Sequence, residues 1–213
     1  MENTIIEQWQ YKTKIDNQSL VIPDGCRDVL LWSAKGKRPR LLITSLDEKS
    51  YYANIKAGDY LHGFRLKAGT KIDEAKLFGA LEKSGDNLAD IEEKIRDFTT
   101  LSVNVKQALD CLASGVNSVN DAAVNLGVSN KTLQRIISKN TGRTPASWLC
   151  LARVRKSARV VGSSINLAQS AIAFGYSDQS HMNREFKRWL NITPAKINNE
   201  PEILEQLKNS AYC

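Results

Sequence analysis

Two short segments of this chain carry polar side chains at the spacing that places them on one face of a helix. Those side chains are Lys131, Gln134 and Arg135 in the first segment and Gln179, Ser180, Asn183 and Arg184 in the second. Arginine can make a bidentate contact to guanine, and glutamine or asparagine can make one to adenine. Basic residues farther along are better suited to phosphates, namely Lys139, Lys187 and Arg188. His181 faces either DNA or solvent. These sets indicate two helices that read DNA in the major groove.

A sequence repeat supplies the elements that must position these side chains. Val119 to Pro145 and Leu167 to Pro194 share an Ala-x-x-x-Gly frame, with glycines 48 residues apart. The members of the frame are Ala123, Gly127, Ala171 and Gly175. A small residue lets two helices approach closely, and a glycine lets the chain turn between them. Ser129 in one copy and Ser177-Asp178 in the other then offer caps for a new helix. The repeat predicts two helix-turn-helix units.

The second helix of each unit has an apolar face and a polar one. Its apolar residues recur at the spacing of a buried stripe, as Leu133, Ile136 and Ile137 in the first unit and Met182 and Phe186 in the second. Each unit closes in Thr-Pro, at Thr144-Pro145 and Thr193-Pro194. A single hairpin of this kind also occurs in helical proteins with no nucleic-acid role. Two copies that share the glycine, the arginine and the Thr-Pro favour a DNA reader.

Charge is distributed unevenly along the chain. Residues 1–100 hold 16 Lys and Arg against 16 Asp and Glu, whereas residues 101–197 hold 13 against 4. Residues 198–213 hold 1 against 3. The net charge of +7 therefore comes from the segment that contains the repeat, as phosphate contact requires.

The segment from Leu101 to Ile197 resembles the DNA-binding domain of the AraC/XylS transcriptional regulators. The unit from Ala168 to Pro194 carries the most specific part of this resemblance, through the run from Ala171 to Ser180 and through Arg184, Phe186, Lys187, Thr193 and Pro194. The connection between the units resembles the family's linker helix at Trp148, Leu149, Arg153, Val154 and Ala158. Three residues depart from the family pattern in ways that change packing or a helix cap, namely Ile137, Met182 and Asn191.

This resemblance implies a regulator that binds double-stranded DNA and activates transcription through RNA polymerase, although repression would use the same DNA contacts. By position it places the base-reading residues at the seven polar positions of the two segments. Two recognition helices would enter successive major grooves about one helical turn, or about 34 Å, apart. Because both units lie on one chain, we expect a fragment from Leu101 to Ile197 to bind DNA as a monomer. A homodimer would then add affinity.

Short apolar runs between Ser19 and Lys71 have the length and composition of β-strands. They are punctuated by turn sequences such as Pro23-Asp24-Gly25 and Lys67-Ala68-Gly69. The pattern predicts an α+β chain, in which a small antiparallel β-barrel or sandwich precedes an all-α double helix-turn-helix domain. The segments IPDGCRDVLLW and HGFRLKAGT resemble parts of the amino-terminal β-domain of some AraC-type regulators. This resemblance implies that the β-rich part of the chain is a sensor domain.

We expect four parts along the chain. Residues 1–83 form the β-rich sensor or regulatory domain, 84–100 a linker helix, 101–197 the DNA-binding domain and 198–213 a carboxy-terminal tail. In the linker, an amphipathic helix from Asn87 to Phe98 is expected to pack as a lid on the barrel or, alternatively, to mediate dimerisation. Its apolar stripe is Leu88, Ile91, Ile95 and Phe98. Ser84-Gly85-Asp86 and Thr99-Thr100 are the expected hinges.

Charged residues flank the apolar strands and offer a site for a polar ligand. Arg27, Asp28, His62 and Arg65 are expected to meet at a concave mouth and hold a sugar or another small effector. An acid/base site that adds Asp24 is the enzymatic alternative. The chain has only two histidines and lacks a nucleophile elbow and a phosphate-binding glycine loop, so we predict no enzyme. A domain that only docks a protein or a second copy of itself is the third possibility.

The four cysteines are scattered and include no Cys-x-x-Cys pair, which predicts no metal site, no disulfide framework and no cofactor. Cys111 and Cys150 lie in apolar helical stretches and are expected in the core. Cys26 follows a turn and is a candidate reactive or ligand-facing thiol. No run of 18 apolar residues occurs, and the segment from Met1 to Tyr11 has no apolar signal core. We therefore expect no membrane partner and a cytoplasmic, nucleoid-associated protein.

Overall fold

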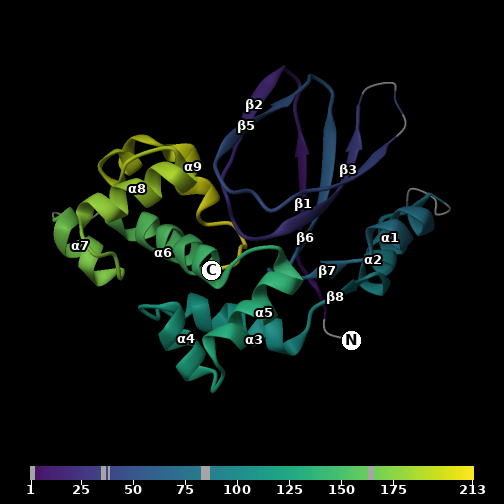
Figure 1. Ribbon diagram of the computed structural model, residues 1–213. Helices are drawn as coiled ribbons and strands as arrows, with labels where there is room; N and C mark the ends of the chain where they lie inside the picture. Colours follow the sequence, from purple (N-terminus) through teal and green to yellow (C-terminus); the bar gives the residue numbers. More distant parts are fainter. Residues whose placement is uncertain (1–2, 35–36, 38, 83–86, 163–165) are drawn as a thin grey trace.

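A computed structural model of the chain describes residues 3–34, 37, 39–82, 87–162 and 166–213. The longer strands gather on one side of the molecule and helices α3 to α9 on the other, while α1 and α2 lie beyond the sheets (Figure 1). The strands are β1 (Ile5–Lys12), β2 (Asn17–Val21), β3 (Arg27–Ser33), β4 (Arg40–Ile43), β5 (Tyr51–Ile55), β6 (Tyr60–Leu66), β7 (Lys71–Ile72) and β8 (Thr99–Thr100).

These strands form three antiparallel sheets. One has the order β1-β6-β3-β4, and the others pair β2 with β5 and β7 with β8. The expected antiparallel β-rich domain is confirmed; among the described residues its sheets do not close into a barrel and are compatible with the sandwich alternative. Strand β1 was not predicted from the sequence. It pairs with β6, so that Trp9 lies opposite Gly63.

The β-domain has its own hydrophobic core. Val29, Phe64 and Leu66 from the four-stranded sheet pack against Ile91 and Ile95. These two isoleucines belong to α2 (Leu88–Asp97), which with α1 (Glu74–Leu81) contributes to this core. The predicted amphipathic helix is thus present and packs on the sheet. Its first stripe residue, Leu88, is exposed.

The structure describes only one of the two segments that were expected to be hinges. Ser84-Gly85-Asp86 lies outside the described residues. Thr99-Thr100 forms strand β8, which pairs with β7. The Thr99 hydroxyl also lies 2.6 Å from that of Thr4. This connection is therefore tied to two other parts of the β-domain.

Gly63 is required because the indole of Trp9 covers it. A Cβ atom at position 63 would lie 2.2 Å from Cε2 of Trp9. We expect Gly63→Ala to lower the free energy of unfolding by about 1–3 kcal/mol, because the ring and the strand must move apart. Urea denaturation measures this. The matched control is Gly79→Ala in α1, where a Cβ meets no neighbouring segment within 4 Å. That variant should be neutral or more stable, and equal losses in both would contradict the packing argument.

The helical domain continues from β8. Its helices are α3 (Val103–Ala113), α4 (Val119–Asn125), α5 (Asn130–Thr141), α6 (Pro145–Val161), α7 (Leu167–Ala173), α8 (Gln179–Leu190), the 3-10 helix η1 (Pro194–Asn199) and α9 (Pro201–Gln206). The long α6 joins the α4–α5 pair to the α7–α8 pair. Leu20 and Ile22 of the β-domain belong to the same buried cluster as these helices. These two residues of the β-domain therefore complete the core of the helical domain, while the core of the four-stranded sheet is separate from it.

Candidate nucleic-acid interface

Both predicted units fold as helix, glycine turn and helix. Gly127 and Gly175 have φ values of 65° and 76°, in the left-handed region that favours glycine. In each unit the residue after the glycine donates its backbone N–H to the alanine of the frame, at 3.0 Å in the first copy and 2.9 Å in the second. Ser129 then caps α5 by accepting from the Thr132 N–H, and Asp178 caps α8 by accepting from the His181 N–H.

The expected apolar faces of α5 and α8 are buried except at Ile136, which is half-buried. Leu133 and Ile137 on α5 and Met182 and Phe186 on α8 have no exposed surface. Two of the departures from the family pattern, Ile137 and Met182, therefore fill the core. The third, Asn191, ends α8 with a φ of 59°, and Gly142 ends α5 in the same way with a φ of 70°. Asparagine tolerates this conformation better than other residues that have a Cβ.

The polar faces of α5 and α8 point away from the core. The exposed side chains among the expected DNA contacts are Lys131, Gln134, Arg135, Lys139, Gln179, Ser180, Arg184, Lys187 and Arg188. Asn183 and His181 are half-buried. The His181 ring packs edge-on against Tyr176, and its Nδ1 accepts from the Ser177 N–H at 3.3 Å. His181 is thus partly engaged in the turn of its own unit.

Some of the basic residues of the helical domain do not lie on the polar faces of α5 and α8. Arg143 is 7 % exposed and Arg155 is fully buried. The guanidinium of Arg143 donates to the backbone oxygens of Leu46 and Asp47, both at 2.7 Å, and lies between two tryptophan rings. Arg155 donates to the Pro23 oxygen at 3.1 Å. Sequence reasoning missed these two arginines as contacts between the halves, and counting charges overstated the basic surface.

The four residues expected to bind a ligand do not meet at one mouth. Successive residues of a strand point to opposite faces of the sheet. Arg27 pairs with Leu66 and therefore shares a face with His62, whereas Asp28 pairs with Arg65 on the other face. His62 is 2 % exposed, and neither ring nitrogen has a hydrogen-bond partner among the described residues. Burial lowers the pKa of His62, which keeps the imidazole neutral.

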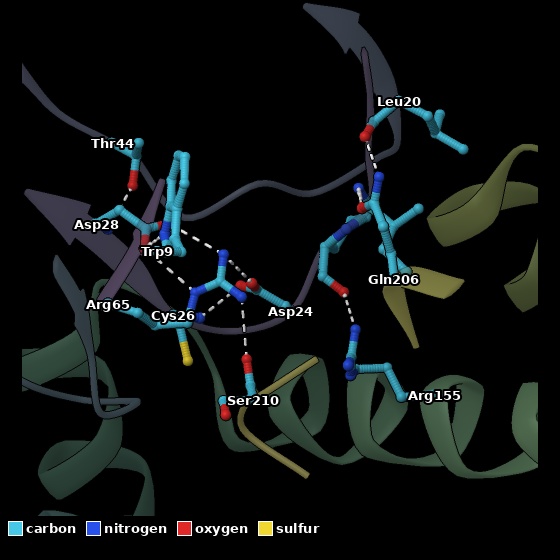
Figure 2. A network of polar contacts seen from close by, with 12 residues as sticks. Trp9, Leu20, Asp24, Cys26, Asp28, Thr44, Arg65, Arg155, Gln206 and Ser210 are labelled. Carbon is cyan, nitrogen blue, oxygen red and sulfur yellow. Dashed lines mark hydrogen bonds and ion pairs between the residues drawn. The ribbon is translucent and has the colours of Figure 1, made fainter. Parts of the chain in front are cut away.

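Arg65 is instead the centre of a polar network between the halves (Figure 2). Its guanidinium donates to both carboxylate oxygens of Asp28 and to the Ser210 backbone oxygen, and it forms an ion pair with Asp24 at 3.3 Å. The indole of Trp9 donates to the same Asp28 carboxylate at 3.0 Å. Desolvation raises the pKa of Asp24, and the Arg65 charge opposes that effect. This network ties strands β3 and β6 to the carboxy-terminal tail.

The tail lies between the two halves of the molecule. The side chain of Gln206 accepts from the Ile22 N–H at 3.1 Å and donates to the Leu20 oxygen (Figure 2). Tyr212 donates its N–H to the Asp24 oxygen and its hydroxyl to the Leu109 oxygen. The only sequence signal for this packing is the apolar spacing of Ile203, Leu207 and Tyr212.

The cysteines and the strand-end charges show no reactive arrangement. Cys26 is 5 % exposed, and desolvation raises the pKa of its thiol, so the hypothesis of a reactive Cys26 is wrong. Cys111 and Cys150 are half-buried and pack against the helical core, as expected. Within the described ranges, no helix is both long and apolar enough to cross a membrane.

The carboxyl of Asp47, whose backbone oxygen accepts from Arg143, makes the stability of the fold sensitive to pH. Desolvation raises the pKa of the Asp47 carboxyl to about 6, against 3.8 for the free side chain. Between these values the folded state holds a proton that the unfolded state has lost, so stability falls as pH rises through that range. We expect Asp47→Asn to be more stable than the natural chain at pH 7 and to lose this pH dependence. Urea midpoints for both proteins between pH 4 and 7 test this, and parallel curves would contradict it.

Comparisons with known proteins match the helical domain to one family model and the chain to several solved structures. Residues 122–200 match the family model described as "Helix-turn-helix domain". The carboxy-terminal domain of AraT, a response regulator from Geobacillus stearothermophilus, is 22% identical over 46% of this chain and 85% of its own, with a TM-score of 0.42. ToxT from Vibrio cholerae is 10% identical over 94% of this chain and 97% of its own, with a TM-score of 0.46.

A third similar structure is an AraC-type transcriptional regulator from Chromobacterium violaceum. It is 21% identical over 50% of this chain and 94% of its own, with a TM-score of 0.39. No curated protein matches the chain. The matched segment begins in α4 and ends after η1, so it includes both turn glycines and both recognition helices. Residues 122–200 are therefore identified as a helix-turn-helix domain.

Proposed function

We propose that this protein is a sequence-specific activator of transcription that reads two major grooves with α5 and α8. The observation that carries this proposal is the shared core under the two helices. Leu133 and Ile137 of α5 and Phe186 of α8 belong to one buried cluster, while the opposite faces of both helices are exposed and polar. The long α6 packs against both helices, so we expect it to hold them at one separation before DNA is bound.

The roles of individual side chains follow from their chemistry. Arg135 and Arg184 suit bidentate contact to guanine, and Gln134, Gln179 and Asn183 suit adenine. Lys131 and Ser180 contribute further contacts to base edges. Lys139, Lys187 and Arg188 lie toward the ends of their helices and suit phosphates, which position the protein without reading sequence. His181 supports the turn of the second unit.

The contacts between the halves give the β-domain a means of control. A ligand that favours one arrangement of the two domains would change DNA affinity by as much as it prefers that arrangement. We therefore propose control by a small effector bound in the amino-terminal half. Contact with RNA polymerase would give activation, a homodimer would add affinity, and action on chromosomal DNA would place the protein at the nucleoid in the cytoplasm.

Mapping of the genomic sites bound by the full chain tests this proposal. We expect a limited set of sites that share a sequence, and higher transcription of the adjacent genes when the protein is present. The control is a chain with Arg135→Ala and Arg184→Ala together, which should lose the shared sites. Uniform occupancy of DNA would overturn sequence-specific reading, and lower transcription at the bound sites would replace activation by repression.

A further inference from the structure

A buried arginine joins the end of the first recognition helix to the end of the second. Arg143 follows Gly142, the residue that ends α5, and its side chain is turned into the protein. Its guanidinium carbon lies 6.0 Å from the ring centroid of Trp148 in α6 and 5.7 Å from that of Trp189 in α8. A cation at this distance from an aromatic face is attracted to it. Arg143 therefore connects the first unit with the linker helix and with the second unit.

The two rings that hold the guanidinium are anchored by other contacts. Trp148 and Trp189 have no exposed surface. The indole N–H of Trp148 donates to the Thr141 hydroxyl at 2.9 Å, and that of Trp189 donates to the Glu185 carboxylate at 3.1 Å. Because both rings are fixed in the helical core, a shift of α8 relative to α6 must disturb the guanidinium between them.

A loop of the β-domain braces the same contact. The segment between β4 and β5 accepts two hydrogen bonds from Nη2 of Arg143, at the backbone oxygens of Leu46 and Asp47, both at 2.7 Å. In the same loop the Ser50 N–H donates to the Trp189 oxygen at 3.0 Å. One loop thus holds the residue that follows α5 and the last turn of α8.

These contacts give the two recognition helices a connection in addition to α6. The linker helix packs on both, but each unit could tilt about that single contact. A contact between the carboxy-terminal ends of α5 and α8 opposes such a tilt. The expected base contacts lie in the first half of each helix, so a change in angle would change where they meet DNA.

We propose that Arg143 is a positioning residue for DNA reading, which holds the angle between α5 and α8 and thereby limits the spacing of the two base sequences that the chain accepts. This inference rests on the proposed function, in which both helices read DNA, and it adds the residue that selects their spacing. Insertion of one base pair moves a block of sequence by about 3.4 Å and rotates it by about 35° around the DNA axis. A rigid pair of helices cannot follow both changes.

Titration of the full chain on three duplexes tests this inference. Each duplex carries the two blocks found by selection, at the selected spacing or at one base pair more or less. We expect the natural chain to prefer the selected spacing by about tenfold or more, because a shifted block loses a base contact. Arg143→Met fills the space between the rings without the charge or the donors. It should reduce the preference to about threefold or less, because a less rigid pair of helices adapts to either spacing.

Two outcomes separate the role of Arg143 from the proposed function. If Arg143→Met weakened binding to all three duplexes equally, the arginine would be merely structural and the inference would be overturned, while reading by two helices would stand. If the natural chain itself bound the three duplexes alike, reading by two rigidly linked helices would fail as well.

Further variants make the result specific. Gly63→Ala loosens the β-domain at Trp9, outside the contacts of Arg143, and should keep the full preference for the selected spacing. The same loss of preference in Gly63→Ala would overturn the inference, because any destabilisation would then relax the spacing. Arg143→Lys keeps a cation and one donor nitrogen. If Arg143→Met does not fold, an intermediate preference in Arg143→Lys supports the inference, and an unchanged preference overturns it.

Discussion

Replacement of Arg65 by alanine is expected to lower the free energy of unfolding by about 3–5 kcal/mol, because it leaves a buried carboxylate without its cation. The side chains of Arg65 and Asp28 are 15% and 11% exposed, so water replaces little of the lost interaction. The variant also loses the contact with the tail at Ser210. Urea denaturation of the full chain measures the effect.

A surface ion pair provides the control for Arg65. Lys56 and Asp16 are 70% and 65% exposed, and Lys56→Ala should lower the free energy of unfolding far less than Arg65→Ala does. If Arg65→Ala were as mild as Lys56→Ala, the network would contribute nothing to joining the halves. Because Arg65 holds the fold, its alanine variant is also unsuitable as a test of ligand binding.

Arg135→Ala and Arg184→Ala are each expected to weaken binding to a specific duplex by about 1–3 kcal/mol, because each removes a bidentate base contact. The two residues lie on different helices, so the losses should add to about 2–6 kcal/mol in the double variant. Titration on specific and scrambled duplexes should show a much smaller change on the scrambled one.

Lys187→Ala, on the same helix α8 as Arg184, should have a different effect from Arg184→Ala. Loss of a phosphate contact should weaken all duplexes alike and reduce the slope of the salt dependence by about one. If Arg184→Ala also weakened both duplexes equally, Arg184 would be a phosphate contact and its assignment to a base would be wrong.

The helix-turn-helix repeat was predictable because its signals are local. Gly127, Ser129 and Leu133 specify a turn, a cap and a buried face within seven residues, and the second unit repeats the pattern. The β-rich character of the amino-terminal half could be predicted in the same way from short apolar runs between turns. Strand β1 was missed although Gln8 to Lys12 alternates between polar and apolar residues, because the pairs Ile5-Ile6 and Glu7-Gln8 interrupt that pattern.

The alternation of side chains between the two faces of a sheet could already have excluded the predicted ligand site. Arg27 and Asp28 are adjacent, and His62 and Arg65 are three residues apart, so in regular strands neither pair can share a face. The contact of Arg143 with Leu46 joins residues 97 positions apart, and no local pattern indicates it. The contacts of the tail with the β-domain also join residues that are more than 100 positions apart. A fragment that ends at Ile197 lacks Ile203, Leu207 and Tyr212, which pack on its core.

Selection of duplexes from a random library by the purified full chain tests the central claim most directly. If α5 and α8 both read DNA from one rigid chain, the selected sequences will contain two short blocks whose centres lie about one helical turn apart. Arg135→Ala should relax one block and Arg184→Ala the other. A single block, or binding without any shared sequence, would contradict the account.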